Sequence, residues 1–450
     1  MSFSIDQIIE LNIQNLGNSG EGVGYYDGTT VFVEGGLPEE TLLVKIKEKK
    51  KNYAIAQLVN IIRPSSQRIS PSCPIFKTCG GCQLMHLNYE AQLIAKERKV
   101  REALRRIGGL EQIPVLPCQP SPQTLGYRNK IQLAAFSKNE GISLGMYAKG
   151  THENISIEQC MIHSSVGEDI LPTLKDLLNT FSITAYCKER KEGELRHILI
   201  RSTVKHHEVL VVFICNGPPS TALLEVSKQL LEKFPTVKGV VANINQRHDN
   251  VILGKTFITL CGKETITETL LGMEFHVSAA SFFQVNPLQA EALYLKVIEL
   301  AQPNTSDTIL DCYCGVGTMS LLFASQGTSV IGIESVPEAI EDAKANAETN
   351  GIRSCEFICG FAEKVLRHVK PFECALLNPP RKGCDKNLLI ELLRRSPPQI
   401  IYVSCDPATL ARDVKILVEG GYRAECAVPF DMFPQTAHVE TVLKLQKVIT

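Results

Sequence analysis

Two residues near the end of this chain have side chains suited to covalent and general-base chemistry. Cys405 follows an apolar segment, residues 400–404, that predicts a strand, and Pro407 favours the start of a helix. A helix N-terminus favours the nucleophilic thiolate of a cysteine, although the charge of Asp406 opposes it. Glu440 opens the last apolar segment, where a carboxyl group is expected to have a raised pKa that suits a general base. The alternatives are a buried structural cysteine and a solvated glutamate.

A glycine turn earlier in the chain predicts a cofactor site. Gly315 and Gly317 follow the strand-like residues that end in Asp311, without the third glycine of the dinucleotide-binding fingerprint. Glu334 ends the next strand-like segment, twenty-three residues after Asp311, and is placed to bind two ribose hydroxyls. These features favour S-adenosylmethionine over NAD, and the lack of a Gly-Lys-Ser/Thr loop argues against ATP. The alternative is a glycine turn that binds no ligand.

A second motif is expected beside this turn. Asn378-Pro379-Pro380-Arg381 directly follows an apolar strand, so the Asn378 side chain is expected over the cofactor crevice. Asn-Pro-Pro followed by an aromatic residue is typical of amino-group methyltransferases, in which the ring stacks on a flipped base. Arg381 occupies the aromatic position here. An amino-group methyltransferase and a plain proline-rich loop are the alternatives that this motif leaves open.

Four cysteines have a spacing suited to a metal site. Sixteen cysteines in a chain that we expect to be cytosolic are more consistent with thiols, metal ligands or a nucleophile than with disulfides. Cys73, Cys79 and Cys82, with Cys160 as the fourth ligand, suit either a [4Fe-4S] cluster or tetrahedral zinc. The spacing differs from that of radical enzymes. Unrelated free thiols are the other alternative.

Charge is balanced over the whole chain but not along it. The 450 residues include 47 Lys and Arg and 48 Asp and Glu. Residues 41–110 alone include fourteen Lys and Arg but only four Asp and Glu, an excess of ten positive charges. Because phosphate contacts dominate nucleic-acid affinity, this excess predicts an RNA-binding surface, with solvated faces as the alternative. The helical part of the surface is expected to bind through Lys96, Lys99, Arg101 and Arg105.

The expected elements divide the chain into three domains. Short strands between glycine turns predict an OB-like β-barrel over residues 1–62. Residues 63–270 contain the cysteines, a basic amphipathic helix over 89–107 and a mixed α/β domain. Strands and helices alternate over 271–450, which predicts a Rossmann-like, doubly wound, mostly parallel sheet with ligands at the carboxyl ends of its strands. The expected fold class is therefore α/β.

Composition excludes several other classes of protein. Apolar residues make up 44% of the chain and charged residues 21%, as in ordinary globular domains rather than disordered chains. No stretch approaches the roughly 18 apolar residues needed to span a bilayer. We therefore expect a cytoplasmic monomer with no membrane and no obligate protein partner.

The motifs together resemble the RNA uracil-C5 methyltransferase family, specifically its bacterial 23S rRNA branch, over essentially the whole chain. Residues 20–25 and 31–38 look like a TRAM domain, and the four cysteines match the family's iron–sulfur ligands. The resemblance implies methylation of a uridine in RNA, most of all in 23S rRNA. A tRNA enzyme of the same family is the alternative substrate class.

The resemblance also implies a role for individual residues. Phe282 is similar to the aromatic residue that stacks on the target base, Cys405 to the nucleophile and Glu440 to the base. The implied cofactor-binding residues are Gln284, Tyr313, Thr318, Glu334 and Asn378. The family usually has Asp where this chain has Asn378, and some members have Asn at the position of Thr318.

The residues and the resemblance indicate the same mechanism. Cys405 adds to C6 of uracil, C5 takes the methyl group of S-adenosylmethionine, and Glu440 removes the C5 proton. The base must leave its stack to reach such a pocket. The iron–sulfur cluster would organise the RNA-binding surface, because no step is a redox step. The competing classes are an amino-group methyltransferase, for which Cys405 is dispensable, and a non-catalytic RNA-binding or assembly factor.

Overall fold

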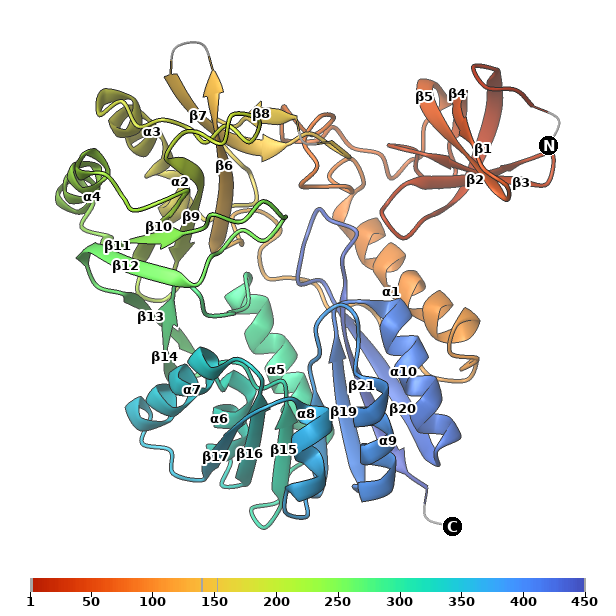
Figure 1. Cartoon of the computed structure of the whole chain (residues 1–450). Helices are drawn as coiled ribbons and strands as arrows, with labels where there is room; N and C mark the ends of the chain where they lie inside the picture. Colours follow the sequence, from red (N-terminus) through yellow and green to blue (C-terminus); the bar gives the residue numbers. More distant parts are fainter. Residues whose placement is uncertain (1–2, 139–140, 152, 449–450) are drawn as a thin grey trace.

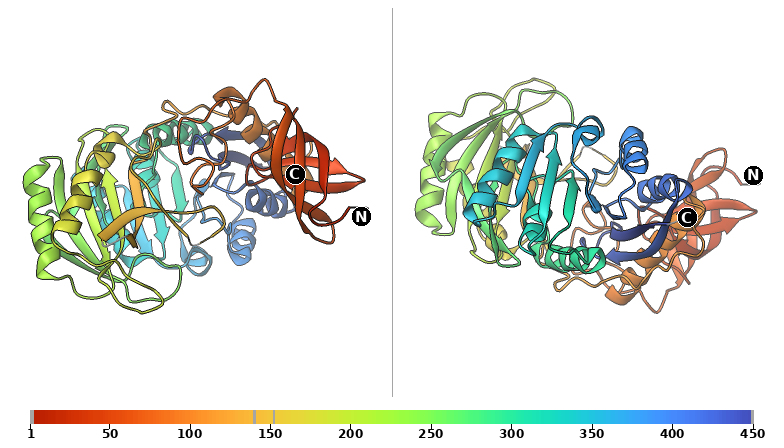
Figure 2. Two further views of the ribbon diagram at one scale, coloured as in Figure 1. Left: turned by 90° about the horizontal axis from the view of Figure 1, so that it is seen from above. Right: turned by 90° about the horizontal axis from the view of Figure 1, so that it is seen from below.

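The computed structural model describes residues 3–138, 141–151 and 153–448, which form a barrel, two large sheets and a hairpin. Figure 1 shows the middle sheet and the barrel on opposite sides of the upper part of the molecule and the C-terminal sheet below them, and in both views of Figure 2 the barrel and the middle sheet lie at opposite ends. The predicted α/β class is confirmed. Among the helices of the described ranges, none is long and apolar enough to cross a membrane.

The N-terminal part forms the five-stranded barrel that was predicted. It closes in the order β1-β2-β3-β5-β4. Alternate residues point inward, so that Leu11, Val31 and Val44 are buried in its core. The strands are β1 (Ile8–Leu16), β2 (Gly22–Tyr26), β3 (Thr29–Val33), β4 (Thr41–Lys49) and β5 (Tyr53–Arg63).

One long helix connects the barrel to the rest of the chain. Helix α1 (Tyr89–Arg106) begins at Asn88, whose side chain accepts a hydrogen bond from the Ala91 N–H at 2.9 Å. The buried side chains Val100 and Leu104 pack with the C-terminal sheet, and α1 contacts α10 and β20 of that region. The helix is therefore positioned beside the elements that follow Cys405, although it precedes the middle sheet in sequence. The three domain limits given above stay a prediction.

The middle part has the mixed α/β structure that was predicted. Its sheet has the order β12-β11-β10-β9-β6-β7-β8, and α3 and α4 pack on one of its apolar faces. The strands are β6 (Lys130–Lys138), β7 (Gly141–Tyr147), β8 (Asn154–Ser156), β9 (Leu195–Ser202), β10 (Val209–Cys215), β11 (Val237–Ile244) and β12 (Thr256–Gly262). The helices are α2 (Ser165–Glu168), α3 (Leu171–Thr180) and α4 (Thr221–Lys233), and a hairpin of β13 (Thr265–Leu270) and β14 (Met273–Ser278) follows.

The C-terminal part is the predicted doubly wound sheet, with one strand inserted out of order. The sequence of strands is β17-β16-β15-β18-β19-β21-β20, and the first five are parallel. The last strand, β21, lies antiparallel between β19 and β20. The strands are β15 (Thr308–Cys312), β16 (Ser329–Glu334), β17 (Cys355–Cys359), β18 (Cys374–Leu377), β19 (Gln399–Ser404), β20 (Tyr422–Phe430) and β21 (Glu440–Lys447). The helices are α5 (Pro287–Ala301), α6 (Thr318–Ala324), α7 (Pro337–Thr349), α8 (Ala362–Val365), a short 3-10 helix (Leu366–His368), α9 (Lys386–Arg395) and α10 (Pro407–Glu419).

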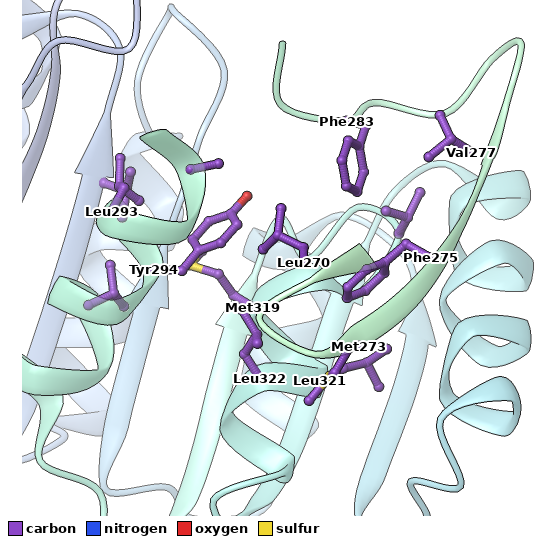
Figure 3. Packing of buried hydrophobic residues seen from close by; sticks show 14 of the residues in the cluster. Leu270, Met273, Phe275, Val277, Phe283, Leu293, Tyr294, Met319, Leu321 and Leu322 are labelled. Carbon is purple, nitrogen blue, oxygen red and sulfur yellow. The ribbon is translucent and has the colours of Figure 1, made fainter. Parts of the chain in front are cut away.

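One apolar core joins the hairpin to this sheet. Phe275 of β14, Leu293 of α5 and Leu321 of α6 are fully buried in the same cluster (Figure 3). Such burial fixes the segment between β14 and α5, which contains Phe282 and Gln284, against the sheet.

Candidate active site

Cys405 and Glu440 come together at one edge of the C-terminal sheet. In the antiparallel pair of β19 and β21, Ser404 is the partner of Thr441. Cys405 is the next residue after Ser404 and Glu440 the residue before Thr441, so the register brings them to the same place at the carboxyl end of β19. Cys405 is half-buried, and Glu440 is 6% exposed. The pair therefore lies where a doubly wound sheet binds its ligands.

The environment of Glu440 suits proton transfer. Burial raises the pKa of Glu440 to about 7, while the nearby Arg381 guanidinium acts to lower it. The raised pKa expected from the sequence is confirmed. A carboxyl group that titrates near neutral pH can accept a proton in one step and return it to solvent later.

The environment of Cys405 disfavours its thiolate form. Burial, and then the charge of Glu440, raise the pKa of the Cys405 thiol to about 11, and Arg381 acts against this rise. The Asp406 side chain accepts hydrogen bonds from the N–H groups of Ala408 and Thr409 at 2.9 and 3.0 Å. Asp406 therefore caps the helix N-terminus, and its charge opposes the thiolate as the sequence indicated, although burial and Glu440 raise the pKa more. The resting side chain is a thiol.

The turn after β15 has open space and hydrogen-bonding groups for a cofactor. Gly315 has a φ of +56°, and a Cβ atom added there would meet nothing within 4 Å. Glu334 faces the turn and accepts a hydrogen bond from the Gly315 N–H at 3.3 Å. Asp311 is buried, and its Oδ1 has no hydrogen-bond partner in the described part of the chain. An open turn, a carboxylate and an unpaired acceptor fit the hydroxyl and ammonium donors of S-adenosylmethionine.

The other predicted cofactor residues surround the same turn. Tyr313 has a φ of +66°, which is uncommon for a residue other than glycine, and its hydroxyl faces Cys384. Thr318 is the first residue of α6, and Asn378 directly follows β18. Because β15 and β18 are parallel neighbours, these residues lie at the same edge of the sheet. Their roles in cofactor binding stay predictions.

Two consecutive aromatic residues point in opposite directions. Phe282 is 69% exposed, whereas Phe283 is buried against Phe275, with 6.0 Å between the ring centroids. Figure 3 shows Phe283 directed into the apolar cluster. Gln284 is buried and forms a side-chain hydrogen bond with Tyr294. The charge of Glu440 is near enough to raise the pKa of the Tyr294 hydroxyl. The segment therefore leaves the Phe282 ring exposed for stacking and turns Gln284 toward the interior.

Two family models match the chain. The model of the tRNA (Uracil-5-)-methyltransferase family matches residues 88–448, and the TRAM-domain model matches residues 5–59. The chain belongs to the tRNA (uracil-5-)-methyltransferase family. The resemblance seen in the sequence is confirmed, and the TRAM match coincides with the five-stranded barrel.

Relatives of this methyltransferase match it over nearly its whole length. Proteins named as uncharacterized RNA methyltransferases of Bacillus cereus and Clostridium acetobutylicum are each 40% identical to it, over 98% of this chain and 97% of theirs. A crystal structure of Pyrococcus abyssi tRNA (uracil-54, C5)-methyltransferase in complex with S-adenosyl-L-homocysteine is 32% identical, with a TM-score of 0.78. It covers 97% of this chain and 100% of its own. These matches confirm the predicted enzyme class, an RNA methyltransferase, and support S-adenosylmethionine as its cofactor.

The four predicted metal ligands are gathered in one region. Cys73, Cys82 and Cys160 pack on one small apolar cluster, and Cys79 is close enough to Cys73 and Cys160 for their thiols to affect one another's ionisation. Within the described ranges, no three His, Cys, Asp or Glu side chains are grouped so as to hold a metal ion. The four thiols are therefore neighbours but do not form a ligand set. The predicted [4Fe-4S] cluster stays a prediction.

The basic run of α1 is used in part within the protein and not wholly as the predicted RNA-binding face. Lys96 is 1% exposed and forms an ion pair with Asp431. Lys99 donates hydrogen bonds to two backbone carbonyl groups, and Arg101 and Arg105 form ion pairs with glutamates one turn away on the same helix. The prediction is wrong for Lys96, whose charge is buried within the protein, and stays a prediction for Lys99, Arg101 and Arg105. The total charge of a segment cannot reveal this, since it contains no information on burial.

Sequence reasoning assigned no role to Arg381. Its charge acts on both Cys405 and Glu440, lowering the pKa of each against the effect of burial. A signal was present, because Arg381 directly follows Asn-Pro-Pro at the end of β18. The comparison with amino-group methyltransferases shows only that Arg381 replaces an aromatic residue there, and it does not indicate the effect of the guanidinium charge.

Proposed function

We propose that this chain methylates C5 of a uridine in RNA, first of all in 23S rRNA, through a covalent bond between Cys405 and C6 of the base. The observation that carries the proposal is the β19–β21 register, which joins Cys405 to a buried carboxyl group, Glu440, beside the cofactor turn. An amino-group methyltransferase has no use for such a pair, and a non-catalytic RNA-binding factor needs neither residue.

The proposed reaction uses each residue once. The Cys405 thiol loses its proton to solvent, the thiolate adds to C6, and the electron pair of the C5–C6 double bond moves into the enolate, so that C5 becomes nucleophilic. S-adenosylmethionine supplies the methyl group that C5 takes. Glu440 then removes the C5 proton, the C5–C6 double bond re-forms, and Cys405 leaves as a thiolate. Arg381 favours the charged form of Cys405, and Phe282 stacks on the base that has left its helix.

The cofactor would be held by residues at the carboxyl ends of β15, β16 and β18. Glu334 accepts hydrogen bonds at the turn and is placed for the ribose hydroxyls. Gln284, Tyr313, Thr318 and Asn378 are the remaining proposed contacts. Burial raises the pKa of Asp311 to about 7, and an ammonium group beside its unpaired oxygen would favour the carboxylate form.

The RNA class has two candidates. The TRAM barrel and the cysteine region are the features that favoured 23S rRNA over tRNA in the sequence. Transfer RNA is the second candidate, because a tRNA (uracil-54, C5)-methyltransferase matches 97% of this chain, including the region of the barrel. The barrel carries the exposed rings of Tyr25 and Tyr53, which suit stacking with unpaired bases of either RNA. The cytoplasmic location and the monomeric state stay predictions from the sequence.

The product identifies both the reaction and the RNA. The full chain is incubated with S-adenosylmethionine and, separately, with ribosomal RNA and tRNA that lack modifications, and the digested RNA is analysed by mass spectrometry. We expect one methyl group on uridine, in 5-methyluridine, and we expect it in 23S rRNA. Methyluridine in tRNA alone would move the proposal to the second candidate. Methylated adenosine or guanosine, or no product, would overturn it.

We further propose that Cys73, Cys79, Cys82 and Cys160 hold a [4Fe-4S] cluster. Burial and then the neighbouring thiols raise the pKa of Cys82 to about 12, and a bound metal would favour the thiolate forms that serve as ligands. Protein purified without oxygen is expected to be brown and to contain about four irons per chain. Iron analysis and the visible spectrum measure both properties.

A matched pair of variants tests which thiols bind the cluster. Cys82→Ser should lose the iron and the colour, whereas Cys187→Ser, at a half-buried thiol outside the proposed set, should keep both. Zinc in a one-to-one ratio without visible absorption would reject the iron–sulfur cluster in favour of a zinc site.

A further inference from the structure

The segment that leads into Glu440 has no helix or strand of its own. We call residues 431–439, between β20 and β21, the base loop. Gln435 in this loop has a φ of +70°, a left-handed conformation that a residue other than glycine adopts only when its surroundings hold it. The position of Glu440 therefore depends on its pairing with Phe430 in β20 and on what holds the base loop before it.

Three side chains of α1 hold the base loop. The ammonium group of Lys96 forms a buried ion pair with Asp431 and also donates to the Phe433 carbonyl at 3.1 Å. Gln92 makes two bonds with Gln435: its amide NH₂ donates to the Gln435 side chain, and its oxygen accepts the Gln435 N–H, both at 3.0 Å. Both side chains are about 1% exposed.

Lys99 of α1 and the segment after Cys82 also contact the base loop. Lys99 donates to the Ala437 carbonyl at 2.8 Å. Residues 92, 96 and 99 lie on one face of α1, at a spacing of one and two helical turns. The N–H groups of Gln83 and Leu84, directly after Cys82, donate to the Gln435 carbonyl at 3.0 and 2.9 Å. The base loop is thus held from α1 and from the cysteine-bearing segment at once.

We propose that Gln92, Lys96 and Lys99 of α1 are positioning residues for Glu440, acting through the base loop. The proposal rests on the proposed function. None of the three touches the reacting atoms. Lys96 contacts the start of the nine-residue loop, Gln92 its middle and Lys99 its last third. Glu440 is the residue that follows the loop. Without these three side chains, Cys405 would still lie directly after β19 beside the cofactor turn, and Glu440 would stay paired with Phe430, whereas the loop that leads into the carboxyl group would lose its contacts with α1.

The test separates the step of Cys405 from the step of Glu440. Formation of a covalent adduct with RNA containing 5-fluorouridine depends on Cys405 and the cofactor, because fluorine cannot leave C5 as a proton. Tritium release from RNA tritiated at uridine C5 depends on Glu440. In Gln92→Leu we expect adduct formation and the KM for RNA to be unchanged. Tritium release and kcat should fall about 10- to 100-fold, as when a reacting group is misplaced by roughly 1 Å.

Two further variants keep the result decisive. Ile94→Gln changes a residue on the opposite, exposed part of α1 and should behave like the wild type in both assays. Lys99→Met removes the Ala437 contact from a less buried position and replaces Gln92→Leu if that variant does not fold. Equal loss in both assays, or no loss in either, would overturn the positioning role. Failure of the wild type to form the adduct would instead overturn the proposed function, before any variant is compared.

Discussion

Replacement of Cys405 by alanine is expected to abolish both methyl transfer and the covalent adduct with RNA containing 5-fluorouridine. Without the addition at C6, uracil C5 does not become nucleophilic, and the methyl group has no acceptor. The fall in kcat should be on the order of a million-fold, as when the nucleophile of a covalent enzyme is removed. The adduct is measured as protein of retarded mobility in a denaturing gel with labelled RNA.

The matched control is Cys359→Ala, at an exposed thiol of β17 in the same sheet. It should keep the wild-type rate and adduct, since β17 is four strands away from β19. Binding of S-adenosylmethionine to Cys405→Ala, measured by calorimetry, should be unchanged. A Cys405→Ala enzyme that methylates uridine at the wild-type rate would rule out the covalent mechanism.

Replacement of Glu440 by glutamine is expected to leave methyl transfer possible and to block release of the product. The amide keeps the size of the side chain but cannot take the C5 proton, so a methylated covalent complex between Cys405 and RNA should accumulate. Turnover should fall about 10²- to 10⁴-fold, the usual contribution of a general base. Mass spectrometry of the trapped complex distinguishes a methylated adduct from an unmethylated one.

The pH dependence of product release gives the same residue an independent test. Burial raises the pKa of Glu440 to about 7, and only the deprotonated carboxylate can act as the base. Release in the wild type should therefore increase as the pH rises through about 7, and the Glu440→Gln variant should lack this step. Glu419→Gln, at an exposed glutamate that ends α10, is the control and should keep the wild-type profile. A Glu440→Gln enzyme with normal release would show that another group is the base.

Much of the fold was predictable because its signals are local. The strand Thr308–Cys312, its glycine turn and the helix after it follow from adjacent residues: an apolar run, glycines with positive φ, and a helix-forming segment. The parallel sheet follows from the repeated alternation of such units. Cys405 could be placed at the carboxyl end of a strand for the same reason. The barrel was likewise indicated by its short strands and their turns.

The tertiary structure alone decided which distant residues surround these positions. Nothing in the last strand shows that β21 inserts beside β19, yet this pairing brings Glu440 to Cys405. The sequence of α1 shows Lys96 as one of a run of basic residues, whereas the fold buries it against Asp431, more than three hundred residues later. Charge and ionisation depend on burial and on partners, which long-range packing determines. The sequence by itself therefore determined the family and the order of the elements and predicted the reactive groups, and the tertiary structure decided their neighbours and the burial on which their ionisation depends.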